Sequence, residues 1–426
     1  MLKVFKLKFF SSIISLFKRY TMAEVVSFLT IPIISRIYSP KEVGVYLFFT
    51  AASEILSTIS TGKYEMAIML PKKKNEAFKI TYGTLYVSVM FCCLVFLLTL
   101  FFENQVSKLF NISPIYSSSF LLLGVLLFSQ NSYKTFENWN NYNKRFKISG
   151  NAKLVQKTSM SGLQIVFSSF GVFGLLWGRV LGLLISLIYM VRVKELLRFF
   201  RKNPTLSKKL LKKYSYFPKV MTPSSLINKT SYNIPNLTYS GMFNPTILGY
   251  YSMAYRFVAL PVSIITNAVG QVFYKEVNEL KNDSTPLFPT LKRFYLFLAA
   301  TGAIPFILGF FFAPKVTVFV LGSQWIESGT IIQIIIPWLY LVYLNSPLTA
   351  ILITIGKQNF LLLFELISIC IKLAGVFIAY YLYDDFIVTT IVYAVIGGLQ
   401  SATLLIFISY LVRVFDRNQL HYKQVK

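Results

Sequence analysis

The sequence has few acidic residues, a single histidine and three cysteines. Lys and Arg number 43, whereas Asp and Glu number 16. The histidine, His421, lies in the C-terminal tail, so catalysis or proton relay by a buried histidine is not available. The phosphate-binding pattern G-x-x-x-x-G-K-[ST] and the zinc-protease pattern H-E-x-x-H are both absent. These absences indicate that the chain is not an enzyme, and we expect no catalytic residue, no cofactor and no metal site.

Charged residues are scarce as well. They make up 14% of the chain, against about 25% in a soluble domain. Hydrophobic residues make up 55%, and the excess extends along the whole sequence, which predicts an all-α polytopic membrane protein. The net charge of +27 falls in short gaps between apolar runs, so topology explains it better than a nucleic-acid partner. Cys92, Cys93 and Cys370 lie inside apolar runs and are expected to be free hydrophobic side chains.

Twelve apolar segments are long enough to predict membrane-spanning helices, which need about 20 residues each. The predicted spans are 13–34, 44–64, 80–102, 115–133, 158–175, 176–191, 217–240, 247–270, 294–313, 329–354, 360–382 and 386–412. The fifth and sixth spans run into one another. The turn between them is placed after Leu175, with Gly171–Gly174 and Gly178 as alternatives.

The distribution of basic residues tests this topology. With the N-terminus inside, 34 of the 43 Lys and Arg fall in inner segments, 4 in outer loops and 5 at membrane depth. Because cytoplasmic loops carry the excess of Lys and Arg, both termini are expected to be cytoplasmic. The N-terminal basic and apolar stretch resembles a signal peptide, but we interpret it as an uncleaved tail that leads into the first span.

The chain is predicted to have two six-helix halves, at residues 1–191 and 217–412, with a cytoplasmic tail at 413–426. A basic connector at 192–216 joins the halves, and ten Lys or Arg accompany one acid between Arg192 and Lys219. This stretch is too basic to enter a bilayer. Its part around Leu210 and Tyr214 suits either a helix on anionic lipid or a solvated linker.

An internal repeat supports the division into halves. The pattern P-x-x-x-G-x-Y occurs at Pro40–Tyr46 and again at Pro245–Tyr251, 205 residues later. Each copy follows an Ile-Pro pair in the preceding span. Because six is an even number of spans, the two halves would share one orientation and enclose a central cavity.

Ionisable residues at membrane depth are the candidates for function, because each is costly in lipid. The candidates are the cations Lys63, Arg179, Lys229, Arg256 and Lys372 and the acids Glu24, Glu54 and Glu365. The cations either line a lumen or form buried ion pairs, and Lys63 and Arg179 could lie near helix ends. The acids either pair with them or carry coupling protons. The excess of cations favours an anionic substrate.

Several stretches resemble the Wzx-type polysaccharide flippases, within the superfamily that includes MATE multidrug exporters and lipid II flippases. They are 31–46, 248–257, 260–274, 321–325 and 355–358, and with the twelve-span plan the resemblance covers nearly the whole chain. It implies a flippase for undecaprenyl-pyrophosphate-linked oligosaccharide repeat units of O-antigen, capsule or exopolysaccharide. Arg256 stands where related lipid II flippases place a lumen arginine.

The same resemblance implies alternating access in the bacterial inner membrane, with membrane lipids, a polysaccharide polymerase and a chain-length regulator as partners. Two rival functions stay open. A multidrug cation antiporter shares the fold but needs a dominant acidic site in its lumen. A polysaccharide polymerase is also polytopic but is expected to carry a large outer loop, which the span plan does not contain.

Overall fold

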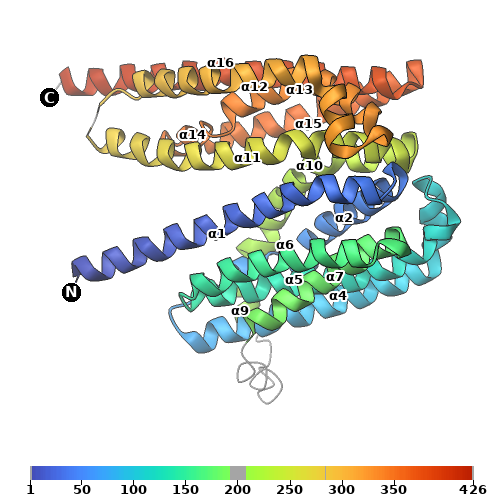
Figure 1. Cartoon of the computed structure of the whole chain (residues 1–426). Helices are drawn as coiled ribbons and strands as arrows, with labels where there is room; N and C mark the ends of the chain where they lie inside the picture. The colour runs from blue at the N-terminus through green and yellow to red at the C-terminus, as the bar shows by residue number, and fades with distance from the viewer. Residues whose placement is uncertain (1, 192–207, 284, 425–426) are drawn as a thin grey trace. The chain divides into compact units, whose positions relative to one another are not determined.

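The computed structural model describes residues 2–191, 208–283 and 285–424, and within these ranges the chain forms helices and no strands. The prediction of an all-α protein is therefore confirmed. Twelve helices of this described part have 19 residues or more (Figure 1). They are α1 (Leu2–Ile37), α2 (Pro40–Ser60), α4 (Lys74–Leu109), α5 (Leu121–Tyr142), α6 (Phe146–Val166), α7 (Val172–Met190), α10 (Thr222–Met242), α11 (Pro245–Asn282), α12 (Phe288–Leu321), α13 (Ile326–Asn345), α15 (Gln358–Tyr383) and α16 (Phe386–Gln424).

Short elements join the long helices. They are α3 (Tyr64–Ala67), α9 (Lys208–Lys213), α14 (Ala350–Thr354), the 3-10 turns η1 (Pro114–Phe120), η2 (Ser168–Phe170) and η4 (Ser323–Trp325), and the π-helical turn η3 (Phe217–Met221). The predicted tenth span is interrupted, because α13 ends at Asn345 and α14 begins only at Ala350.

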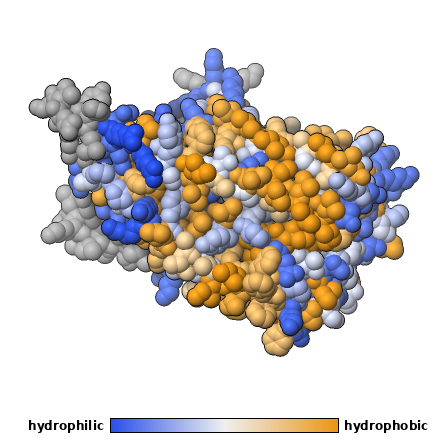
Figure 2. All heavy atoms as spheres, turned by 90° about the horizontal axis from the view of Figure 1, so that it is seen from above, coloured by the Kyte–Doolittle hydropathy of each residue, from blue (hydrophilic) through white to orange (hydrophobic). Residues whose placement is uncertain are grey.

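Nine helical segments of the described chain are long and apolar enough to cross a membrane. They include α1, α2, α4, α7, α11, α12, α15 and α16 and the stretch Ser323–Thr354. Figure 2 shows broad areas of hydrophobic side chains on the surface, as a protein surrounded by lipid requires. The chain is thus a multi-pass membrane protein. Helices α5, α6 and α10 are more polar, so the count of twelve spans and the cytoplasmic position of both termini stay predictions.

The division of the fifth and sixth spans after Leu175 is wrong. Helix α6 ends at Val166, η2 follows, and α7 begins at Val172. The turn is at Gly171, the first residue of the alternative Gly171–Gly174, where φ is +55°, a conformation that glycine adopts without a steric penalty. Apolar residues continue through this turn, so hydropathy alone could not locate it.

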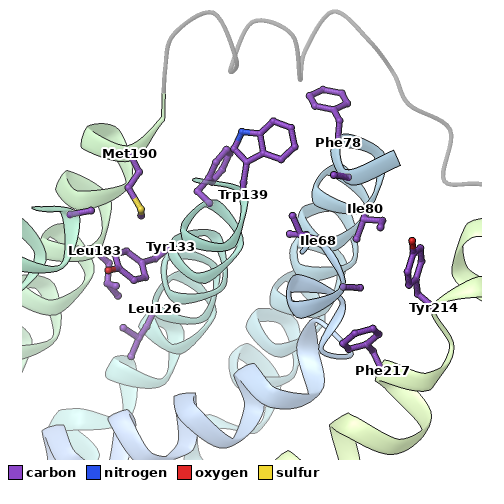
Figure 3. Packing of buried hydrophobic residues seen from close by; sticks show 14 of the residues in the cluster. Ile68, Phe78, Ile80, Leu126, Tyr133, Trp139, Leu183, Met190, Tyr214 and Phe217 are labelled. Atoms are coloured by element: carbon purple, nitrogen blue, oxygen red, sulfur yellow. The ribbon is translucent and has the colours of Figure 1, made fainter. Parts of the chain in front are cut away.

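The chain forms two compact units, Met1–Gly249 and Tyr250–Lys426. In the first unit α1 packs on α6, α6 on α7, α4 and α7 on α5, and α10 on α2 (Figure 1). Trp139 and Tyr133 of α5 form its buried core with Phe78 of α4 and Leu183 of α7 (Figure 3). In the second unit α13 packs between α12 and α16, and α15 packs on α16. The proposed halves divide the chain before α10, whereas the contacts group α10 with the first unit.

Most of the predicted connector, residues 192–207, lies outside the described residues. Its described end, α9, is anchored to the first unit: Nζ of Lys213 lies 2.6 Å from Oε1 of Glu76, and the Tyr214 hydroxyl lies 3.0 Å from the same oxygen. Phe217 belongs to the core cluster shown in Figure 3, and Leu210 packs against that cluster. The hydrogen bond to Glu76 raises the pKa of Lys213, so this contact is present at neutral pH and is lost as the pH rises through that raised pKa.

The Pro40–Gly44 and Pro245–Gly249 parts of the two repeat copies pack against each other, and both lie within the first unit. A Cβ atom added to Gly44 would lie 1.7 Å from the Pro245 carbonyl oxygen, and one added to Gly249 would lie 2.0 Å from the Pro40 carbonyl oxygen. The glycine of each copy therefore faces the proline of the other. Because only a residue without Cβ permits this approach, the repeat encodes a backbone-to-backbone helix contact.

Candidate functional site

Three helices of the first unit bring Glu54, Arg179 and Lys229 together. Glu54 lies on α2, Arg179 in the middle of α7 and Lys229 in the first half of α10. Nζ of Lys229 is 3.2 Å from Oε2 of Glu54, and NH2 of Arg179 is 3.9 Å from Oε1. The carboxylate therefore bridges two cations from different helices. The alternative that Arg179 lies near a helix end is wrong.

Lys134 adds a further cation, which the span plan predicts to lie in an inner loop. Helix α5 continues to Tyr142, beyond the predicted end at Tyr133, so Lys134 lies within it. Its Nζ donates to the Ser57 hydroxyl at 2.9 Å, and it interacts electrostatically with Glu65 and Lys63 and, less strongly, with Glu54 and Lys229. The polar end of α5 made it look like a loop. Gln130 and Lys134 are one helical turn apart, and this spacing of polar residues is the sequence signal that the helix continues past Tyr133.

The site has a net positive charge and stays partly accessible. Arg179, Lys229 and Lys134 surround Glu54, and the Lys63–Glu65 ion pair near Lys134 adds no net charge, which leaves two positive charges when all six groups are ionised. The exposed fraction of the side chain is 43% for Lys229, 28% for Glu54 and 20% for Arg179. Arg179 also donates to the Tyr46 hydroxyl at 3.5 Å. This arrangement can bind an anion through charge-assisted hydrogen bonds.

We call Arg179, Lys229, Lys134 and Glu54 the α2–α10 charge cluster.

Lys63 follows the end of α2 with φ of +58°, and its Nζ lies 3.8 Å from the buried Glu65. The alternative of a helix-end position for Lys63 is therefore confirmed. Glu65 was missed because the predicted span ended at Tyr64.

A different kind of cation site occurs in the second unit. Nζ of Lys372 lies 5.1 Å from the ring centre of Trp338 and 5.6 Å from that of Tyr393. Both distances fit cation–π contacts. Among the described residues Lys372 has no carboxylate within salt-bridge distance. Two aromatic rings therefore hold this ammonium and leave its charge uncompensated.

The Trp338 ring depends on a glycine of α16. A Cβ atom on Gly397 would lie 2.8 Å from the Trp338 indole, whereas one on the neighbouring Gly398 would meet nothing within 4 Å. We expect Gly397→Ala to displace the indole and to weaken the hold on Lys372 by about 0.5–2 kcal/mol. The tryptophan fluorescence spectrum of this variant should differ from that of the wild type. Gly398→Ala is the matched control, and an equal response of both variants would contradict the assignment.

The remaining predicted residues do not join these sites. Glu24 of α1 lies 3.6 Å from Lys157 of α6, so it has a partner within the first unit. Glu365 of α15 is exposed and makes no ion pair with Lys372 in the described structure. Arg256 of α11 is half-buried and has no carboxylate within 4.0 Å among the described residues.

A family comparison decides the class of this protein. The model of the family described as polysaccharide biosynthesis protein matches residues 33–330. The chain belongs to this polysaccharide biosynthesis family. The matched range includes α2, α7 and α10, and with them the α2–α10 charge cluster. No curated protein sequence matches the chain.

Solved structures share the fold over almost the whole chain. A lipid II flippase MurJ in an inward closed conformation has a TM-score of 0.72 and 12% identity, covering 96% of this chain and 99% of its own. An inward-facing multidrug MATE transporter of the MOP superfamily has a TM-score of 0.66 and 15% identity, covering 93% and 96%. A MOP superfamily transporter from Pyrococcus furiosus, described as having reversed polarity in its binding pocket, has a TM-score of 0.56 and 16% identity, covering 94% and 95%.

Together these findings confirm the resemblance and the fold that the sequence predicts. The protein belongs to a polysaccharide biosynthesis family and has the fold of MATE transporters and the MurJ flippase. These structural neighbours are transporters and flippases, not enzymes. A family of polysaccharide biosynthesis with a flippase fold supports a flippase or transporter of a lipid-linked substrate.

Proposed function

We propose that this protein flips undecaprenyl-pyrophosphate-linked oligosaccharide repeat units from the cytoplasmic to the outer leaflet of the bacterial inner membrane. Transport proceeds by alternating access of two six-helix halves around a central cationic cavity. Lys229 and Arg179 bind the diphosphate, with Lys372, Arg256 and Lys63 as further cations. The polymer is O-antigen, capsule or exopolysaccharide, and a polymerase and chain-length regulator act on the flipped units.

The observation that carries the proposal is the net positive α2–α10 charge cluster in a polysaccharide biosynthesis protein. Basic side chains from α7 and α10 converge on one carboxylate and stay partly exposed, and Lys134 of α5 lies close by on the Ser57 hydroxyl. An anionic diphosphate fits this charge balance, because phosphate oxygens are good acceptors for Arg and Lys. A multidrug cation antiporter needs the opposite sign. A polymerase receives no support from the transporter fold.

A deletion strain tests the proposed function directly. We expect loss of surface polysaccharide and accumulation of undecaprenyl-linked repeat units that an impermeant enzyme added outside cannot reach. Complementation should make the repeat units accessible to the external enzyme again, which would support flipping. Drug sensitivity with unchanged polysaccharide would instead indicate a multidrug exporter, and surface-exposed but unpolymerised repeat units would indicate a polymerase.

Arg256→Leu is expected to abolish surface polysaccharide while the protein stays in the membrane. Arg256 has no acidic partner in the described structure, so its charge is available to a diphosphate. Losing a hydrogen bond to a charged group costs about 1.5–3 kcal/mol of binding. Polymer analysis and membrane immunoblots provide the measurement. The control is Arg293→Leu, since 75% of that side chain is exposed. Normal polymer from Arg256→Leu would remove Arg256 from the proposed site.

A further inference from the structure

Glu54 offers both oxygens of its carboxylate to cations on two other helices. Oε2 lies 3.2 Å from Nζ of Lys229, and Oε1 lies 3.9 Å from NH2 of Arg179. A diphosphate would need the same two cations. We propose that Glu54 is an internal stand-in for the substrate diphosphate: it holds Arg179 and Lys229 between transport cycles, and the diphosphate displaces it on binding. This inference rests on the proposed function.

The charges of the cluster match this exchange. With Glu54 ionised, Arg179, Lys229 and Lys134 leave a balance of two positive charges. Displacement of Glu54 leaves the three cations with three positive charges, and a diphosphate esterified at both ends carries one negative charge on each phosphorus, so the exchange lowers the net charge of the site from two positive charges to one. Without a carboxylate the cations would repel one another across a site of low dielectric constant. Glu54 lowers this repulsion while no substrate is bound.

Neutral partners keep Arg179 and Lys134 in place when the carboxylate leaves. Arg179 also donates to the Tyr46 hydroxyl, and Lys134 donates to the Ser57 hydroxyl. Nε of Arg179 is buried and has no hydrogen-bond partner among the described residues. The guanidinium therefore keeps a donor for a further oxygen, such as that of a phosphate.

The exchange also links substrate binding to a helix contact. Glu54 lies on α2, before the basic connector, and Lys229 lies on α10, which follows it. Displacing Glu54 removes the ion pair between these two packed helices. A ligand shifts a conformational equilibrium only by its differential affinity for the two states. Here the difference is the Glu54–Lys229 ion pair that the bound state lacks.

Binding of inorganic pyrophosphate to the full-length protein in lipid nanodiscs tests this inference. Glu54→Gln keeps the shape of the side chain but removes its charge, so we expect its affinity to rise roughly tenfold, within the usual range of coupling between two ligands. Glu54→Asp is too short to reach both cations and should show a smaller increase. The surface variant Glu279→Gln, with a parent side chain that is 64% exposed, should bind like the wild type.

The outcomes separate this inference from the proposed function. Equal or weaker binding by Glu54→Gln and Glu54→Asp would overturn the stand-in role. If Lys229→Met still abolished pyrophosphate binding, the assignment of the diphosphate site to the α2–α10 charge cluster would stand. If neither the wild type nor any variant bound pyrophosphate, and Lys229→Met cells made normal polysaccharide, both the stand-in role of Glu54 and the proposed diphosphate site would be overturned. Should Glu54→Gln fail to fold, the direction of change in Glu54→Asp decides the question.

Discussion

Cells that carry Lys229→Met in place of the wild-type protein are expected to lose surface polysaccharide, and Arg179→Met cells likewise. Each substitution keeps most of the side-chain length but removes one charged contact to the diphosphate. Such a hydrogen bond contributes about 1.5–3 kcal/mol, equivalent to a roughly ten- to hundredfold loss of affinity. Both substitutions also leave Glu54 with one cation fewer. Surface polymer, measured by gel analysis of whole-cell extracts, should fall below detection when both are combined.

Lys275→Met is the matched control for this prediction. Its side chain is 78% exposed and lies beside Glu279 on the surface of α11, so polymer should stay at the wild-type level. The level of each variant in the membrane must be measured in parallel. If Lys229→Met and Arg179→Met are present in the membrane and still produce normal polymer, the α2–α10 charge cluster is not the diphosphate site.

Gly44→Ala and Gly249→Ala are expected to destabilise the folded protein strongly. The added Cβ atoms would lie 1.7 Å from the Pro245 carbonyl oxygen and 2.0 Å from that of Pro40. These are backbone atoms, so relief requires two helices to separate. Overpacking commonly costs about 1–3 kcal/mol, and a backbone clash lies at the upper end or beyond. Thermal unfolding in detergent should show a clear fall of the midpoint for either variant.

Gly162→Ala provides a control within another helix of the first unit. A Cβ atom there meets nothing within 4 Å, and alanine favours a helix over glycine by about 1 kcal/mol. Its unfolding midpoint should stay equal to the wild type or rise. Equal midpoints for Gly44→Ala and Gly162→Ala would show that the contact between the two repeat copies carries no stability.

Individual functional residues could be found in the sequence, but not their partners. Glu54, Arg179 and Lys229 stand out because each lies at predicted membrane depth, where a charge is costly. Glu54 and Lys229 lie 175 residues apart along the chain, and hydropathy carries no information about which helices become neighbours. Lys134 was assigned to a loop because the polar end of α5 has the composition of a loop. That residue became part of the site only once α5 was seen to continue to Tyr142.

The sequence by itself determined the class of the protein, its helical content and the existence of a repeat. Composition and apolar run length are sufficient for these, since lipid requires a helix to satisfy its own backbone hydrogen bonds. Only the tertiary structure decided that the glycine of each repeat copy faces the proline of the other. It also decided that one carboxylate lies between Arg179 and Lys229, and that aromatic rings hold Lys372. Each of these contacts depends on the packing of helices that are distant in the chain.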